Sequence, residues 1–148
     1  MYGFYGRILR IDLSKEKFVI DPINDDIFEK YLGGKGLASH LLYQLNPVGI
    51  NPLDPANCLI FATGPITASS IWGSSRYGVF TKSPQTGFYS ESYSGGKVPE
   101  AIDSTGFDAI VIQGQSERPT VLSIHPEGVN FMRLATSGEW IPLRQKIL

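Results

Sequence analysis

Alternating apolar and polar positions predict short strands along most of the chain. Between residues 4 and 13, Leu9, Ile11 and Leu13 alternate with Arg10 and Asp12, the pattern of a strand with one apolar face. Similar runs, bounded by Gly, Pro, Asn or Ser positions that favour turns, predict further strands at residues 17–20, 57–63, 76–82, 88–91, 108–113, 120–124 and 129–134. The short turns between several of these runs predict hairpins and antiparallel pairing.

Helical spacing of apolar residues predicts three helices between these strands. Asn24 stands where an N-cap is wanted, before a helix that would leave through a left-handed turn at Gly33 and Gly34. Leucines at helical spacing predict a second helix over residues 36–45, and a third is expected over residues 97–106. The resulting order, ββααβββαβββ, predicts an α+β fold with mostly antiparallel sheets, and not a doubly wound parallel sheet.

Composition and charge limit the classes of function. The chain has 148 residues with 42% apolar and 11% aromatic residues, which is typical of one globular domain. Its 13 basic and 14 acidic residues give a net charge of -1, and this balance argues against a nucleic-acid-binding surface. The apolar runs are too short to span a bilayer, and Met1 is not followed by a signal-peptide pattern. A soluble cytoplasmic protein without membrane partners is therefore expected.

The sequence contains few candidates for catalytic or metal-binding residues. Cys58 is the single cysteine, so the chain has no internal disulfide and cannot by itself hold zinc or an iron–sulfur cluster. Because Cys58 opens an apolar run, a buried and inert thiol is favoured over a reactive one. His40 lies among leucines, where packing is favoured over metal ligation, and His125 lies in a hairpin turn. A catalytic triad is therefore not expected, and no catalytic residue is assigned.

Two loops contain the elements of an anion-binding site. One is rich in small residues and leads through Arg76 into a strand, and the other begins at Tyr93 and continues through Ser94 and Gly95 to Lys97. A helix that starts on such glycines exposes unpaired N–H groups, and a guanidinium can bind the same anion bidentately. The alternative is that Arg76 is a solvated strand-edge cation and that the glycines form an ordinary turn.

Two further patterns permit two interpretations each. Glu91 and Glu100 flank the second loop and could form a carboxylate pair, although solvation at the surface is the commoner fate of such residues. The run from Gly33 to Gly36 contains Lys35 but lacks the spacing and the Ser or Thr of a phosphate-binding P-loop. A break between helices is favoured there over nucleotide binding.

Several segments together resemble the N-terminal domain of the tungsten-containing aldehyde ferredoxin oxidoreductase family. The resemblance is ordered and continuous from residue 1 to about Glu117, and it is carried by residues 1–14, 31–38, 62–67, 76–87, 94–96 and 106–114. It implies a domain of two β-sheets with helices, which forms the base for a bis-pterin tungsten or molybdenum cofactor. Enzymes of this family oxidise aldehydes to carboxylic acids and pass electrons through a [4Fe-4S] cluster to ferredoxin.

The resemblance also implies roles for four residues. Arg76 matches the arginine that contacts the phosphate end of the pterin. Tyr93, Ser94 and Gly95 match a loop whose backbone meets the phosphates and a bridging magnesium ion, with the carbonyl of Tyr93 as the metal ligand. The family often has asparagine at the position of Tyr93, and a backbone ligand would survive that difference.

Members of this family are several times longer than this chain. Residues 1–148 are therefore expected to be the N-terminal cofactor-base domain of a larger oxidoreductase, cut at the C-terminal end and inactive alone. The [4Fe-4S] cluster would be bound by downstream domains, and the partners would be those domains, ferredoxin and, through exposed apolar surface, a second copy in a homodimer. The alternatives are a free-standing anion-binding or scaffold domain without redox activity, and a nucleotide-binding enzyme that uses Gly33 to Gly36.

Overall fold

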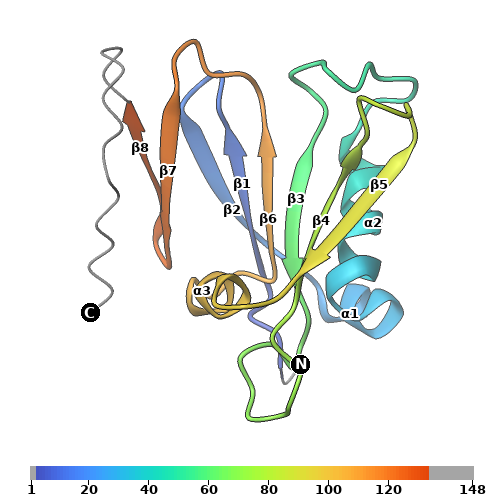
Figure 1. Ribbon diagram of the computed structural model, residues 1–148, viewed down its shortest axis with the longest axis vertical. Helices are drawn as coiled ribbons and strands as arrows, with labels where there is room; N and C mark the ends of the chain where they lie inside the picture. Colours follow the sequence, from blue (N-terminus) through green and yellow to red (C-terminus); the bar gives the residue numbers. More distant parts are fainter. Residues whose placement is uncertain (1–2, 134–148) are drawn as a thin grey trace.

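The computed structural model describes residues 3–133, in which the predicted order of strands and helices is confirmed (Figure 1). The described elements are β1 (Arg7–Asp12), β2 (Lys17–Pro22), α1 (Asp25–Tyr31), α2 (Gly34–Leu45), β3 (Leu59–Thr63), β4 (Tyr77–Lys82), β5 (Tyr89–Ser94), α3 (Val98–Ser104), β6 (Ala109–Gln113), β7 (Thr120–His125) and β8 (Gly128–Arg133). The predicted strand end at residue 134 and the predicted cut in the tail lie outside the described residues.

Six of the strands form one sheet in the order β2-β1-β6-β3-β4-β5, and β7 and β8 form a separate hairpin. The neighbouring pairs are antiparallel except β1 with β6, which run parallel with Ile8 opposite Ala109. The sheets are therefore mostly antiparallel, as the α+β prediction requires. The parallel pair places β1 of the first hairpin beside β6, a strand about a hundred residues later in the chain. Strand β6 also pairs with β3, so it connects the first hairpin to the rest of the sheet.

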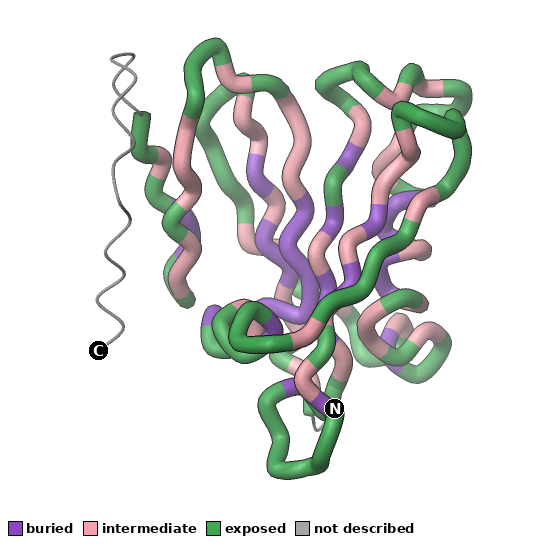
Figure 2. Tube along the Cα trace, viewed as in Figure 1, coloured by how far each residue is buried: buried purple, intermediate pink, exposed green. Residues whose placement is uncertain are grey.

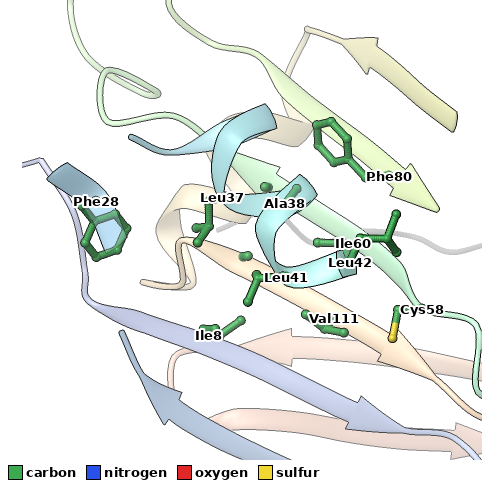
Figure 3. Packing of buried hydrophobic residues seen from close by; sticks show 12 residues of the cluster. Ile8, Phe28, Leu37, Ala38, Leu41, Leu42, Cys58, Ile60, Phe80 and Val111 are labelled. Atoms are coloured by element: carbon green, nitrogen blue, oxygen red, sulfur yellow. The ribbon is translucent and has the colours of Figure 1, made fainter. Parts of the chain in front are cut away.

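Helices α1 and α2 cover one face of the sheet. Their apolar side chains, among them Phe28, Leu37 and Leu41, pack with Ile60 and Val111 from the strands below (Figure 3). All five of these side chains are buried, with at most 9% of their surface exposed. This side of the sheet thus holds one continuous core, which fixes the start of α2 against the strands.

The hairpin of β7 and β8 and part of α3 pack on the other face of the sheet. Here Leu9 and Ile11 of β1 lie against Ile110 of β6 and Val129 of β8, with Ile102 of α3 packed beside them. Figure 2 shows that burial is concentrated along β1, β6 and β3, while most of β5 is exposed. The edge strand β5 is thus exposed along most of its length, whereas β4 beside it is buried or half-buried (Figures 1 and 2).

Several boundaries differ from the sequence predictions by one to three residues. Strand β5 continues to Ser94, three residues beyond the predicted end, because it pairs along the whole of β4. Helix α2 begins at Gly34 and not at Gly36. The left-handed exit expected at Gly33 and Gly34 is found at Gly34, with a φ of 52°, and Leu32 also takes a positive φ of 55°. Helix α3 begins at Val98, so the prediction of a helical first turn at residues 95–97 is wrong.

Candidate functional site

Arg76 ends the long loop between β3 and β4, which projects beyond the sheet near the N-terminus (Figure 1). The buried hydroxyl of Thr67 closes this loop: it accepts the N–H of Gly64 at 3.1 Å and donates to the carbonyl of Arg76 at 3.3 Å. The backbone of Arg76 is therefore held in place at the start of β4. Its side chain is exposed and, within residues 3–133, has no hydrogen-bond or ion-pair partner.

The guanidinium of Arg76 lies against the turn that follows β5. A β-carbon placed on Gly95 would come within 3.0 Å of Nη1 of Arg76 and 3.4 Å of the carbonyl oxygen of Ser75. A side chain at residue 95 would require the guanidinium to shift away from the turn. The two loops singled out in the sequence therefore do converge, although they do so through a turn and a strand end, and not through a helix N-terminus.

A shallow pocket of about 190 Å³ opens beside Arg76. Gly34 at the start of α2, Ile66 and Thr67 in the β3–β4 loop, and Tyr93 on β5 line it together with Arg76. The pocket therefore combines one guanidinium with an apolar and aromatic wall. An oxyanion attached to a small planar or apolar group would match this lining.

Tyr93 forms part of the wall because Gly78 opposite it has no side chain. The two residues face each other across β4 and β5, and the ring of Tyr93 meets the ring of Phe80 edge to face at 5.8 Å. A β-carbon on Gly78 would lie 3.1 Å from the Tyr93 ring and 2.4 Å from that of Phe80. The glycine thus lets the tyrosine lie close over the sheet beside the pocket.

A polar network joins the start of α2 to β5 next to this wall. Lys35 donates to Glu91 at 2.9 Å, and the hydroxyl of Tyr89 contacts Glu91 at 3.1 Å and Ser39 at 2.9 Å. Tyr93 lies close enough to lower the pKa of Glu91 further. The bond from Lys35 lowers the pKa of Glu91 and raises that of Lys35 itself, so both groups are charged at neutral pH.

The four residues assigned by resemblance are placed as follows. Arg76 and Tyr93 line the same pocket, and Gly95 touches Arg76. Ser94 pairs with Tyr77 on the strand, and its side chain lies on the face opposite that of Tyr93, since neighbouring residues of a strand alternate. Sequence reasoning missed Lys35 as a neighbour of Glu91, which is 56 residues away along the chain.

The run from Gly33 to Gly36 forms the junction between α1 and α2. A β-carbon on Gly36 would lie 2.0 Å from the carbonyl oxygen of Tyr31, and one on Gly33 would lie 3.0 Å from that of Thr63. These two glycines permit close packing of α1, α2 and β3, as the helix-break interpretation predicts. Gly34 between them also lines the pocket, which that interpretation did not include.

The other candidate residues take part in packing or in hydrogen bonds within the fold. Glu100 accepts a hydrogen bond from Ser75 at 3.4 Å, while Glu91 binds Lys35, so the two carboxylates have separate partners. The ring of His40 stacks on Tyr31 at 4.6 Å, in agreement with a packing role. Cys58 is fully buried, and burial raises the pKa of its thiol, as expected of an inert cysteine.

Within residues 3–133, no group of three His, Cys, Asp or Glu side chains gathers in a way that could hold a metal ion. None of the helices in this part of the chain has the length and apolar character needed to cross a bilayer.

The family model and two relatives of similar sequence all point to aldehyde ferredoxin oxidoreductases. Residues 8–140 match the family model described as the N-terminal domain of aldehyde ferredoxin oxidoreductase. The tungsten-containing aldehyde ferredoxin oxidoreductases of Thermococcus kodakarensis and Pyrococcus furiosus are 41% and 39% identical to this chain over 129 residues. Each match covers 87% of the chain and 21% of the relative, so the chain spans about one fifth of the length of these relatives.

A solved structure has the same fold. The active-site complex of benzoyl coenzyme A reductase, in complex with 1,5-dienoyl-CoA, superimposes with a TM-score of 0.85 and 31% sequence identity. The similarity covers 89% of this chain and 20% of that chain. The family model, the relatives and the fold therefore agree, and the chain belongs to the aldehyde ferredoxin oxidoreductase family, of which it represents the N-terminal domain.

Proposed function

We propose that residues 1–148 form the cofactor-base domain of a larger cytoplasmic oxidoreductase, which converts aldehydes to carboxylic acids and passes two electrons to ferredoxin. The printed names of the relatives at 41% and 39% identity support the reaction class and the use of tungsten. The observation that carries the proposal is the guanidinium of Arg76, which has no hydrogen-bond or ion-pair partner within residues 3–133 and lies at a pocket with a glycine turn against it. We expect residues 1–148 alone to have no aldehyde-oxidising activity.

The residues of the pocket fit the phosphate end of a pterin cofactor. Arg76 can donate two parallel hydrogen bonds to one oxyanion, and Gly95 leaves its backbone open beside that guanidinium. The lining by Ile66 and Tyr93 offers an apolar and aromatic surface to the organic part that carries the phosphate. The bound cofactor, with tungsten or molybdenum held between two pterins, would supply the redox chemistry.

The roles of this chain's own residues are to bind and to orient. Arg76 would fix the position of the phosphate, Tyr93 would form a wall beside it, and the backbone at Ser94 and Gly95 would contribute further polar groups. A bridging magnesium ion on the carbonyl of Tyr93 is part of the proposal. It would depend on phosphate oxygens for its other ligands, because no carboxylate cluster is present in residues 3–133.

The remaining parts of the proposal concern the rest of the enzyme. We assign three features to the rest of the native protein: the [4Fe-4S] cluster, the contact with ferredoxin and a homodimer interface. This chain covers only 21% of the relative from Thermococcus kodakarensis, so most of such an enzyme would lie in other domains. Aldehyde oxidation consumes water and releases two protons and two electrons, so an electron acceptor such as ferredoxin is required. The alternative is a free-standing anion-binding or scaffold domain without redox activity.

Metal analysis of the native protein that contains this chain tests the proposal. We expect tungsten or molybdenum in stoichiometric amounts, and a phosphorylated pterin released on denaturation and identified by mass spectrometry. The remainder of the gene should also encode a Cys-x-x-Cys-x-x-x-Cys type of cluster motif. A native protein that ends near residue 148 and contains neither metal would establish the scaffold alternative instead.

A further inference from the structure

The ion pair of Lys35 and Glu91 borders the Arg76 pocket. Lys35 follows Gly34, which lines the pocket, in the first turn of α2. Glu91 lies two residues before Tyr93, so both side chains project from the same face of β5, and Tyr93 lines the pocket as well. A lysine and a carboxylate are therefore paired beside two of the residues that line the pocket, and in the described part of the chain Arg76 is the one arginine among those lining residues.

We propose that Lys35 is a second anion-binding residue of this pocket, which exchanges its partner Glu91 for a ligand that carries two phosphate groups. The proposal rests on the proposed function, because it presupposes that Arg76 binds the first phosphate. The ligand class is a diphosphate or a phosphorylated molecule with a second anionic group.

The ion pair is of a kind that can exchange at little cost. The Lys35 side chain is 60% exposed, and exposed ion pairs contribute little to stability because water screens them. Its four-carbon stem also allows the ammonium group to swing, which the planar fork of an arginine would hinder. Leaving Glu91 for a nearby phosphate would therefore be a small rearrangement of one surface side chain.

Glu91 keeps a hydrogen-bond partner when Lys35 leaves it. The hydroxyl of Tyr89 donates to one carboxylate oxygen at 3.1 Å, and Tyr93 also lowers the pKa of Glu91. The carboxylate would therefore remain hydrogen-bonded and partly exposed, and would not become an isolated charge. In this arrangement Glu91 holds Lys35 beside the pocket and competes with the ligand for it.

The charges near the pocket explain why a second cation would be needed. A diphosphate carries at least two negative charges at neutral pH, whereas Arg76 supplies one positive charge. Glu100 lies close by, through its hydrogen bond with Ser75, and would repel the ligand. Lys97, which precedes α3, is the other lysine near the Gly95 turn and serves as the comparison for Lys35.

Titration of the chain with inorganic pyrophosphate at fixed ionic strength tests the proposal by a double-mutant cycle. We expect Glu91→Gln, which retains a hydrogen-bond acceptor for Tyr89, to tighten binding about fivefold by releasing Lys35. In a Lys35→Met background the same substitution should have no effect, and Lys35→Met alone should weaken binding. Orthophosphate, with a single phosphate group, should show a smaller gain from Glu91→Gln.

Two controls separate the exchange from a general effect of charge. Glu100→Gln also removes a negative charge near the pocket, but its effect should be the same with or without Lys35. The gain from Glu91→Gln should survive in a Lys97→Met background. A gain that persists in the Lys35→Met background, or a loss of affinity in Glu91→Gln, would overturn the proposal.

The outcome also distinguishes this proposal from the one on which it rests. If pyrophosphate binds and Arg76→Ala weakens that binding, the anion site stands, and an absent Lys35-dependent gain refutes only the exchange. If the chain binds no pyrophosphate, or binds it equally well without Arg76, both proposals fail.

Discussion

The guanidinium of Arg76 packs directly on the backbone of Gly95, so that a β-carbon at residue 95 would come within 3.0 Å of Nη1. The backbone of Gly95 does not take a positive φ, so the missing side chain matters for space and not for conformation. We therefore predict that Gly95→Ala displaces Arg76 and weakens pyrophosphate binding at least about threefold, with little change in thermal stability. Calorimetric titration and thermal unfolding measure the two effects.

A double substitution shows whether Gly95 acts through Arg76. If it does, Gly95→Ala should cost nothing further once Arg76 is alanine, because the displaced group is already absent. Equal losses from Gly95→Ala in both backgrounds would mean that the glycine contributes to the site in another way, such as direct contact with the anion.

Gly36 gives a prediction about stability. Alanine normally stabilises the interior of a helix relative to glycine, by about 1 kcal/mol. At Gly36 the added β-carbon would lie 2.0 Å from the carbonyl oxygen of Tyr31, so α1 and α2 would have to move apart. We predict that Gly36→Ala lowers the free energy of unfolding in urea by about 1–3 kcal/mol. Gln44→Ala, at an exposed position of the same helix, is the control and should leave stability nearly unchanged.

Asp108 gives a prediction about pH. It is 5% exposed, and its two carboxylate oxygens accept the N–H groups of Tyr5 and Arg7, both at 3.1 Å. Burial raises the pKa of Asp108 by more than these bonds lower it. Asparagine cannot accept on both sides, so Asp108→Asn should lower the free energy of unfolding by about 1–3 kcal/mol at pH 7.

The sign of the pH dependence follows from the raised pKa. The folded chain holds the proton of Asp108 more tightly than the unfolded chain, so this carboxyl group adds stability as the pH falls through its folded pKa. That contribution is complete below the ordinary value of about 3.9. The stability difference between the wild type and Asp108→Asn should therefore grow as the pH is lowered from 7 toward 4. A difference that shrinks over this range would mean that the hydrogen bonds outweigh burial.

Much of the fold could be predicted from local patterns. The alternation in β1 and the leucine spacing in α2 identify both elements, because burial of one face repeats at the period of the backbone. The end of β5 could not be predicted in this way. Its serines and tyrosines look polar on both faces, and only pairing with β4 extends the strand to Ser94.

The candidate site was less predictable than the fold. Arg76 and Tyr93 were identified by the glycine-rich loops and by family resemblance, and they do line one pocket. The contribution of Gly34 and the contact between Lys35 and Glu91 depend on how α2 lies across the sheet. Local pattern does not contain that information, because it arises when α2 packs on a core formed by distant strands.

The central claim is that Arg76 binds an oxyanion in its pocket, and calorimetric titration of the wild type, Arg76→Ala and Arg118→Ala with inorganic pyrophosphate tests it most directly. Arg118 is exposed on another loop, so its substitution removes the same charge away from the pocket. We predict that Arg76→Ala weakens binding about 5- to 150-fold, which corresponds to about 1–3 kcal/mol, while Arg118→Ala changes it little. Equal affinities in all three proteins would contradict the account.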